Sequence, residues 1–294
     1  MFLPIKLLNF INIDYLNWSL LCSNPNAIDL LKDNLENINW SLLCSNPNAI
    51  ELLRDNLENI NWFILSTNPN AIELLKEYPE KINWDYLSKN PNAIDLLKDN
   101  LDKINWDNLS GNPNAIKLLK EYPEKINWYY LSSNINAIDI LKKNIDKIDW
   151  YILSANINAI ELLKENQDKI NWINISSNIN ALEIIKQNLD KIKWFHLSRN
   201  PSAIELLKEY PHKINWSMLS ANPNAIDLLK ENPQKINWNM ISLNPSIFKY
   251  DYEKMRINNL KLNEEIIMEV LHPKRIFKLI KKYGEDEIYN IYFE

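Results

Sequence analysis

The side chains best suited to binding chemistry stand next to the tryptophans of this chain, at two positions whose residue type changes from one tryptophan to the next. The position directly after tryptophan holds, in chain order, Ser19, Ser41, Phe63, Asp85, Asp107, Tyr129, Tyr151, Ile173, Phe195, Ser217 and Asn239. The position five residues after tryptophan also varies, and its members include Lys89, Gly111, Ala155, Arg199, Ala221 and Leu243. Large apolar side chains at solvent-exposed positions are typical of protein interfaces, so this pattern predicts a surface that binds another protein.

The residues that we expect to contact such a partner combine large apolar side chains with a few charges. They are Phe63, Asp85, Lys89, Asp107, Tyr129, Tyr151, Ile173, Phe195 and Arg199. On a helical wheel the two variable positions lie about 40° apart, so they form one stripe. The mostly apolar position two residues after tryptophan is expected to be partly buried beside that stripe. An alternative stays open, because an exposed position also varies where nothing restrains it.

A strict repeat must position these residues, because all the tryptophans of the chain stand 22 residues apart. They are Trp18, Trp40, Trp62, Trp84, Trp106, Trp128, Trp150, Trp172, Trp194, Trp216 and Trp238. A fixed period of this length is typical of stacked supersecondary units and not of a single globular core. We expect the tryptophans to anchor each unit to the next, and not to form a row of binding residues themselves.

Each repeat is predicted to form a helix, a tight turn and a second helix, as residues 82–103 illustrate. Asn83 is predicted to cap a short first helix that starts at Trp84, because its side chain can accept from the unpaired amides of a first turn. Asn90 and Pro91 are predicted to cap and begin a second, amphipathic helix of two to three turns.

The predicted fold class is therefore all-α: an α-solenoid of eleven 22-residue helix-turn-helix repeats with terminal caps. We expect residues 1–16 to form an N-terminal cap or degenerate half repeat, residues 17–245 the solenoid, and residues 246–294 a helical C-terminal cap. With helix layers about 8–10 Å apart, the stack should extend over roughly 100 Å. A leucine-rich repeat has a similar period but fits less well, because the asparagine here leads into a helix start and not away from a strand.

Two helices are predicted in the C-terminal region, at residues 264–271 and 273–283, and the second should end at Gly284. The basic residues of this region are Lys274, Arg275, Lys278, Lys281 and Lys282. We expect them to be solvated cap charges and helix C-terminal residues, and not a nucleic-acid or lipid site.

No set of residues is arranged for catalysis or for metal binding. His196, His212 and His272 are isolated, without the spacing of a zinc site. Carboxylates recur at one position of the second helix in nearly every repeat, which suits solubility, whereas acid–base catalysis needs two groups in unlike environments. The sequence has no glycine-rich phosphate loop and no nucleophilic triad. We therefore expect no enzyme, no catalytic residue, no metal and no cofactor.

Composition and charge narrow the function classes further. The net charge is -5 and the pI about 5.5, so the chain has no overall positive field that would attract nucleic-acid backbones. Cys22 and Cys44 occupy the same position in neighbouring repeats and are predicted to be buried free thiols in a reducing compartment. The first residues lack the features of a secretory signal, and no apolar run approaches the roughly 20 residues of a membrane span. We therefore expect an intracellular protein that is not secreted and does not insert into membranes.

The KINWxxLSxNPNAIxLLK unit, the NPSIFKYDY segment after the last repeat and the LHPKRIFKLI segment resemble a family of short-repeat proteins that giant DNA viruses of amoebae and other protists encode in many copies. The resemblance covers nearly the whole chain. It implies an α-solenoid and a viral origin, in the host cytoplasm, the viral factory or the virion, and it brings no catalytic residues. The chain departs from the repeat pattern at Asp149 and Lys193, which replace the capping asparagine, and at Ile135, Ile157 and Ile179, which replace proline. Lys193 puts its own cap in doubt.

The sequence thus predicts a non-enzymatic scaffold that binds a host or viral protein through the stripe on the first helix of each repeat. One alternative is binding of single-stranded RNA or another nucleic acid, one base per repeat. The stripe has side chains that could stack on bases, but only Lys89 and Arg199 give it positive charge, and such proteins need a basic groove. A second alternative is a purely structural component of the virion.

Overall fold

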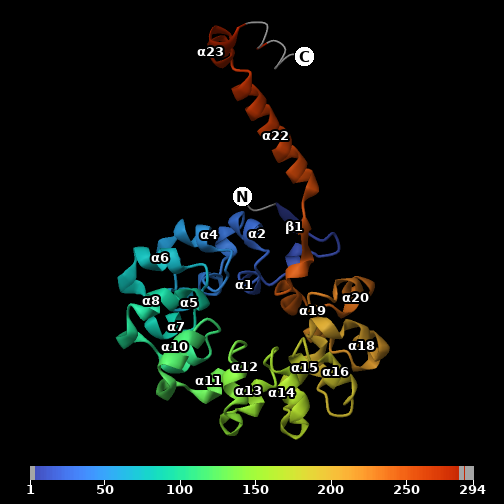
Figure 1. Cartoon of the computed structure of the whole chain (residues 1–294). Helices are drawn as coiled ribbons and strands as arrows, with labels where there is room; N and C mark the ends of the chain where they lie inside the picture. The colour runs from blue at the N-terminus through green and yellow to red at the C-terminus, as the bar shows by residue number, and fades with distance from the viewer. Residues whose placement is uncertain (1–3, 285–287, 289–294) are drawn as a thin grey trace. The chain divides into compact units, whose positions relative to one another are not determined.

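The structure is a computed structural model that describes residues 4–284 and residue 288. It divides into two compact units, one of residues 7–248 and one that combines residues up to 6 with residues from 249 onward. The first unit consists of short helices that recur every 22 residues and contact their neighbours (Figure 1). The predicted all-α repeat architecture is therefore confirmed.

Every repeat begins with a short helix whose first residue is the tryptophan, as predicted. The residue before it caps the helix: Asn83 Oδ1 accepts from Tyr86 N at 3.0 Å, and the carboxylate of Asp149 caps its helix in the same way. Lys193 provides no side-chain cap. These A helices are α1 (Trp18–Leu21), α3 (Trp40–Leu43), α5 (Trp62–Thr67), α7 (Trp84–Leu87), α9 (Trp106–Ser110), α11 (Trp128–Ser133), α13 (Trp150–Leu153), α15 (Trp172–Ser177), α17 (Trp194–Ser198), α19 (Trp216–Ser220) and α21 (Trp238–Ser242).

The second helix of each repeat is shorter than predicted, because the Asn-Pro-Asn-Ala segment forms a separate turn before it. Asn90 Oδ1 accepts from Asn92 N at 3.0 Å and caps the 3-10 turn η5 (Pro91–Ala93), so the α-helix starts only at Ile94. The B helices therefore have five or six residues each. They are α2 (Ile28–Lys32), α4 (Ile50–Arg54), α6 (Ile72–Glu77), α8 (Ile94–Lys98), α10 (Ile116–Glu121), α12 (Ile138–Lys142), α14 (Ile160–Glu165), α16 (Leu182–Lys186), α18 (Ile204–Glu209) and α20 (Ile226–Glu231).

A further 3-10 turn, which the sequence pattern does not predict, follows most B helices. The isoleucine two residues before the next tryptophan closes it, as when Ile82 N–H donates to Pro79 O. These turns are η2 (Leu35–Asn37), η3 (Leu57–Asn59), η4 (Pro79–Lys81), η6 (Leu101–Lys103), η7 (Pro123–Lys125), η8 (Ile145–Lys147), η9 (Gln167–Lys169), η11 (Pro211–Lys213) and η12 (Pro233–Lys235). Two other 3-10 turns, η10 (Pro201–Ala203) and η13 (Pro245–Ile247), correspond to η5.

The asparagine six residues after each tryptophan joins neighbouring repeats. Asn112 is 1% exposed, and its Nδ2 donates to Ser88 O at 3.1 Å and to Asn90 O at 2.8 Å in the preceding repeat. All eleven of these asparagines make the same two bonds. One of the two carbonyls, such as Ser88 O, lies at the C-terminal end of an A helix and has no partner within the helix, and the other, such as Asn90 O, lies in the turn that follows. This requirement explains why the residue does not vary.

The serine four residues after tryptophan makes a second link. Ser66 Oγ donates to Trp62 O at 2.8 Å and accepts the backbone N–H of Asn83, in the next repeat, at 3.1 Å. In the first repeat Cys22 Sγ takes over both contacts, and in the second Cys44 Sγ also accepts the N–H of the next repeat. Both cysteines are buried free thiols, as predicted.

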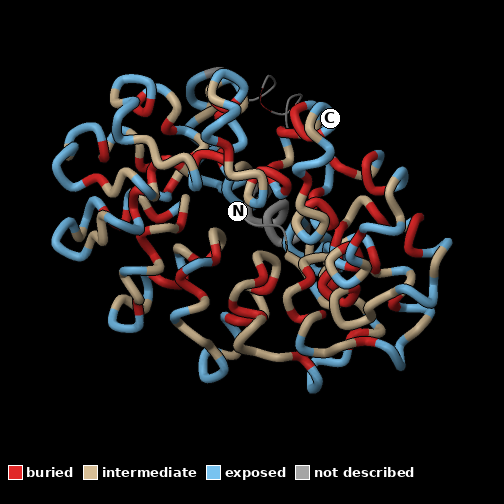
Figure 2. Tube along the Cα trace, turned by 90° about the horizontal axis from the view of Figure 1, so that it is seen from below, coloured by how far each residue is buried: buried red, intermediate tan, exposed pale blue. Residues whose placement is uncertain are grey.

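The apolar core runs continuously between the A and B helices. In one repeat it contains the fully buried Leu87, Ala93 and Leu97, and equivalent residues are buried in the others. Buried segments recur around the trace in Figure 2 and alternate with exposed turns. The tryptophans pack against this core but are only half-buried.

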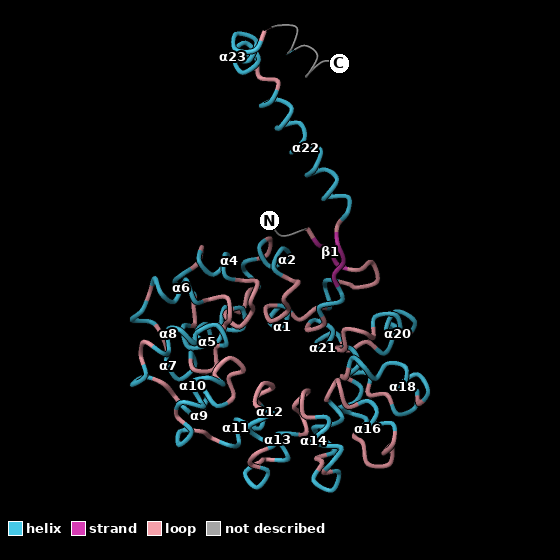
Figure 3. Tube along the Cα trace, viewed as in Figure 1, coloured by secondary structure: helices cyan, strands magenta, loops and turns pink. Residues whose placement is uncertain are grey.

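The eleven repeats close into a ring. Asn24 of the first repeat donates to Ser242 O at 2.9 Å and to Asn244 O at 3.0 Å in the last, which are the same bonds that join adjacent repeats elsewhere. Asn17 N likewise donates to Ser242 Oγ at 2.8 Å, and α1 packs against α21 (Figure 3). The expectation of an open stack about 100 Å long is therefore wrong. Each repeat is rotated by the same small angle, about 33° if a full turn is shared equally among eleven steps.

Both ends of this unit contribute to the eleventh repeat. The chain after Ser242 supplies η13 and then leaves the repeat pattern, whereas η1 (Ile13–Tyr15) supplies the 3-10 turn that normally precedes a tryptophan. Tyr15 packs on Trp238 with ring centroids 5.2 Å apart, and Leu8 N donates to Ile247 O at 2.8 Å. Residues 13–16 thus behave as part of a repeat, and the ring has no open end that a cap would need to cover.

The second unit contains two long helices. Strand β1 (Ile5–Leu7) pairs with β2 (Phe248–Tyr250) in a two-stranded sheet, and Lys6 Nζ contacts Asp251 Oδ1 at 2.9 Å. Helix α22 (Tyr252–Val270) is longer than the predicted residues 264–271, whereas α23 (Pro273–Tyr283) has the predicted bounds. It ends at Gly284, whose φ of 94° favours glycine. Among the described residues no helix is long and apolar enough to cross a membrane.

Candidate binding surface on the A helices

The variable stripe, defined as the residues one and five positions after each tryptophan, lies on the A helices and is largely open to solvent. All nine residues proposed from the sequence are exposed: Phe63, Asp85, Lys89, Asp107, Tyr129, Tyr151, Ile173, Phe195 and Arg199. The five apolar members among them are between 40% and 60% exposed. Such exposure is unusual for large apolar side chains that recur on one helix layer.

The polar residues directly after tryptophan have a structural role that sequence reasoning missed. Asp85 Oδ1 accepts from Nδ2 of Asn105, the capping asparagine of the next repeat, at 2.9 Å, and Asp107 Oδ1 accepts from Asn127 in the same way. Equivalent bonds run from Asn39 to Ser19, from Asn61 to Ser41 and, across the closure of the ring, from Asn17 to Asn239. A small polar residue at this position therefore connects neighbouring A helices.

The apolar residues at the same position cannot make this bond. The two repeats that lack a capping asparagine directly follow two of them: Asp149 follows Tyr129, and Lys193 follows Ile173. Where the preceding repeat has an apolar residue after its tryptophan, Nδ2 of the next capping asparagine has no acceptor there. Replacing that asparagine therefore loses little. The choice of residue at the first variable position is thus coupled to the cap of the next repeat.

Aromatic side chains two positions after tryptophan extend the apolar surface. Tyr86 and Tyr130 are 41% and 36% exposed, which corrects the expectation that this position is partly buried in these two repeats. Their rings are too large for the space that leucine or isoleucine fills elsewhere between A helices. Tyr86 contacts Phe63 edge-on with centroids 6.2 Å apart, and Tyr130 contacts Tyr129 at 5.3 Å. Lys89 Nζ lies 5.6 Å from the centre of the Tyr86 ring.

The tryptophans stand next to this surface, and side chains from later in the chain cover most of their rings. In five repeats a lysine nineteen residues later covers the indole, as Lys103 does at 4.5 Å from the Trp84 ring centre. In three others a tyrosine sixteen residues later takes that place, for example Tyr78 at 5.3 Å from Trp62. These contacts leave most tryptophans shielded on one face, so the prediction that they anchor the stack fits their position better than a binding role.

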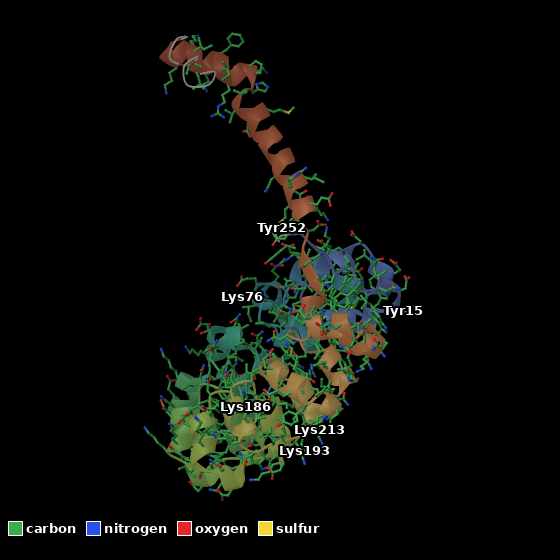
Figure 4. The ribbon with its side chains drawn as sticks, turned by 90° about the vertical axis from the view of Figure 1, so that its right-hand side faces the viewer. Tyr15, Lys76, Lys186, Lys193, Lys213 and Tyr252 are labelled. Carbon is green, nitrogen blue, oxygen red and sulfur yellow. The ribbon has the colours of Figure 1, made fainter. Side chains whose placement is uncertain are left out.

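The charge of the surface changes around the ring. Shallow grooves run between neighbouring repeats: the groove beside Trp62 and Phe63 includes Glu58, Glu80 and one cation, Lys81. The corresponding groove beside Ile173 includes Lys191 and Lys193 instead. In the ninth and tenth repeats the cap, stripe and 3-10 turn positions carry no carboxylate, and their cations are Lys193, Arg199, Lys213 and Lys235. Figure 4 labels Lys193 and Lys213, which project from this part of the ring.

The histidines and the carboxylates of the B helices, which could also serve acid–base or metal chemistry, make local contacts. His196 packs against Phe195 with centroids 5.2 Å apart, and Nδ1 of His272 accepts from Lys274 N at 3.3 Å. Carboxylates on the B helices face solvent, and four of them pair with a lysine three residues later, as in Glu161 with Lys164 at 3.1 Å. Among the described residues no three His, Cys, Asp or Glu side chains are grouped as a metal site would require.

The fold and this surface define a closed ring of helical repeats with one variable face. No family model matches the chain, and no curated protein or solved structure shows significant similarity to it. The likeness to short-repeat proteins of giant DNA viruses therefore rests on the repeat unit and the two segments that follow it, and it stays a prediction.

Proposed function

We propose that this protein is a non-enzymatic ring scaffold that binds a protein partner through the variable stripe of its A helices. The observation that carries the proposal is the exposure of Phe63, Tyr129, Tyr151, Ile173 and Phe195. At the same position, five of the six polar residues bond to the next repeat, and one such bond contributes about 0.5–1.5 kcal/mol. Five repeats forgo that bond and expose apolar surface, which favours selection for binding over drift.

The ring supports such a role because it holds the stripe in a fixed arrangement. Interface residues that are already ordered lose less conformational freedom when a partner binds. Aromatic side chains with few rotatable bonds are well suited to this use. The paired rings of Phe63 with Tyr86 and of Tyr129 with Tyr130 are the contacts that we expect to bury most on binding.

The charges suggest how a partner would be oriented. A segment with apolar side chains facing the sixth to eighth repeats would place acidic groups against Lys193, Arg199 and Lys213. Its opposite end would meet Asp85 and Asp107. Such complementary charges influence orientation and association rate more than affinity. If the chain originates from a giant virus, the partner is a host protein or another viral protein.

Affinity capture from infected cells tests the proposal directly. The intact protein is compared with a variant in which Tyr129, Tyr151 and Phe195 are replaced by serine. A matched control replaces three other exposed isoleucines that lie outside the stripe, Ile135, Ile145 and Ile179, by serine. We expect partners that are lost only from the stripe variant. An unchanged list of partners would refute the assigned face and would favour a purely structural role.

Binding to single-stranded RNA is the alternative outcome. The stripe carries only two cations, Lys89 in the fourth repeat and Arg199 in the ninth, whereas reading one base per repeat requires positive charge along the whole groove. A salt-dependent shift of labelled RNA by the purified protein, abolished by the stripe variant, would support that reading in place of a protein partner.

A further inference from the structure

Helix α23 separates its charged and apolar residues completely. At 100° per residue, its cations occupy one arc of about 120°. They are Lys274, Arg275, Lys278, Lys281 and Lys282. The residues Ile276, Phe277, Leu279 and Ile280 fall on the remaining side, and the helix contains no carboxylate. A helix of this kind is typical of segments that lie on a membrane surface or bind an acidic partner.

The cations of α23 share their helix with no carboxylate, whereas every B helix of the ring carries at least one. On the B helices, Lys76, Lys98 and Lys208 pair with a carboxylate three residues earlier. Among the described residues, no ion pair involves Lys274, Arg275, Lys278 or Lys281, which are all exposed. A chain with a net charge of -5 thus concentrates five cations on eleven residues, and these four have no carboxylate partner among the described residues. Charges that only keep a terminal cap in contact with water would not need to be separated from the apolar residues of the helix in this way.

Exposed apolar side chains accompany these charges. Phe277 on α23 and Met268 near the end of α22 are each 71% exposed, and Leu271 between the two helices is also exposed. Ile276, Leu279 and Ile280 are half-buried, so Phe277 is the residue of the apolar side most open to a ligand. Cations beside protruding apolar side chains match the boundary between phospholipid headgroups and acyl chains.

We propose that α23 is an interfacial anchor that binds the surface of an anionic phospholipid membrane. The helix lies along the surface, with Phe277 inserted at the headgroup boundary and the cations among the phosphates and carboxylates. Eleven residues span about 16 Å, which suits binding along the surface and not across it. Nucleic acid would use the same cations but would gain little from Phe277. This proposal is independent of the stripe on the ring.

Flotation of the full chain with lipid vesicles tests the proposal. Vesicles of phosphatidylcholine are compared with vesicles that also contain phosphatidylserine. We expect binding only to the anionic vesicles, with a loss as salt is raised. One variant replaces Lys274, Arg275, Lys278 and Lys281 by glutamine. Each cation near the surface contributes about a factor of five, so we expect the partition coefficient to fall on the order of 500-fold.

Two further variants separate the possible causes. Phe277→Ser keeps every charge and should lower the partition coefficient by about tenfold or more, because it removes the inserted ring. The matched control replaces four exposed ring lysines by glutamine, and these are Lys120, Lys142, Lys186 and Lys230. It changes the net charge equally and should retain binding. Circular dichroism of all variants checks that the helices form.

Three results would overturn the proposal. The first is absence of binding to anionic vesicles, and the second is equal binding to neutral ones. The third is a loss in the ring control as large as that in the α23 variant, which would indicate a net-charge effect. Binding of an oligonucleotide that depends on the four cations but not on Phe277, without vesicle binding, would assign this helix to nucleic acid instead.

Discussion

At the scale of single residues, the asparagine six residues after each tryptophan determines how the repeats join. The sequence pattern predicted a cap, and the Oδ1 atom does cap a turn, as Asn112 shows by accepting from Asn114 N at 3.0 Å. The two bonds that Nδ2 donates to the preceding repeat could not be predicted, because they depend on how closely the repeats approach. Invariance of the residue in all eleven repeats was the available signal that it does more than cap a short helix.

Replacing this asparagine should therefore cost much more than replacing the next one. Asn112→Ala leaves the buried carbonyl of Ser88 without a donor, leaves Asn90 O with only the N–H of Ala93 and removes the acceptor of Asn114 N, so we expect the free energy of unfolding to fall by about 3 kcal/mol. Asn114→Ala is the matched control, because Asn114 is exposed and donates one bond, to Pro91 O. It should cost about 1 kcal/mol or less. Urea unfolding measures both, and equal losses would contradict the role of the buried asparagine.

The two thiols should titrate later than ordinary cysteines. Burial raises the pKa of Cys22 and of Cys44, and hydrogen bonds from backbone N–H groups offset this only in part. The folded protein therefore favours the neutral thiol, and this contribution to stability is lost as pH rises above the pKa of an unfolded cysteine, roughly 8.5. We expect a thiol reagent to react slowly with the folded protein at neutral pH and rapidly once urea unfolds it. Fast reaction in the folded state would show that these sites open.

At the scale of helices, the starts of the A helices follow from local chemistry and the lengths of the B helices do not. Asn83 before Trp84 predicts the first cap correctly, since a side-chain acceptor is needed wherever a helix begins. The second helix begins later than Asn90 and Pro91 suggest, because the Asn-Pro-Asn-Ala segment forms a turn that is bonded to the preceding repeat, as when Asn92 Nδ2 donates to Pro69 O. Contacts between repeats determine where the second helix begins, and an argument from local sequence propensity takes no account of such contacts.

The one missing cap gives a prediction at this scale. Lys193 leaves the first amides of α17 without a side-chain acceptor, whereas asparagine fills this place in nine other repeats and aspartate in one. Lys193→Asn should raise the free energy of unfolding by about 1 kcal/mol, since a good cap contributes roughly 0.5–2 kcal/mol. Lys193→Ala removes the same positive charge without adding a cap, and it should give no such gain. A thermal melt compares the two, and equal effects would mean that charge and not capping is responsible.

At the scale of the whole first unit, the number of repeats was evident from the sequence but closure of the ring was not. The period of 22 requires that all repeats pack alike, yet the rotation from one repeat to the next is a geometric result of packing and no residue type encodes it. One local signal was present. Residues 13–16 read Ile-Asp-Tyr-Leu before Trp18, like the turn and isoleucine that precede each later tryptophan. This likeness predicts a degenerate half repeat or cap over residues 1–16, and in the structure Tyr15 of that segment packs on Trp238 of the last repeat.

For the stripe, too, some features could be predicted from the sequence and others required the structure. Periodicity placed Phe63, Tyr129 and Phe195 correctly on an exposed face, because the helical wheel depends only on spacing. Periodicity did not predict the exposure of Tyr86 and Tyr130. The expectation of partial burial was made for the position two residues after tryptophan as a whole, whereas these two side chains are too large to be covered. The sequence shows how the stripe residues vary from repeat to repeat. Only the structure shows that the polar stripe residues bond to the capping asparagine of the next repeat.

Ring closure itself can be tested with one residue. Asn24 stands in the first repeat, where an open stack would leave its Nδ2 facing solvent and Asn24→Ala would cost little. In the closed ring Nδ2 bonds to Ser242 O and Asn244 O, as Asn112 bonds to the preceding repeat. Asn24→Ala should therefore lower the free energy of unfolding as much as Asn112→Ala does, within about 0.5 kcal/mol, because the two sites are far apart and equivalent. A loss well below half of that at Asn112, measured in the same urea titration, would show that the ring is open at this interface.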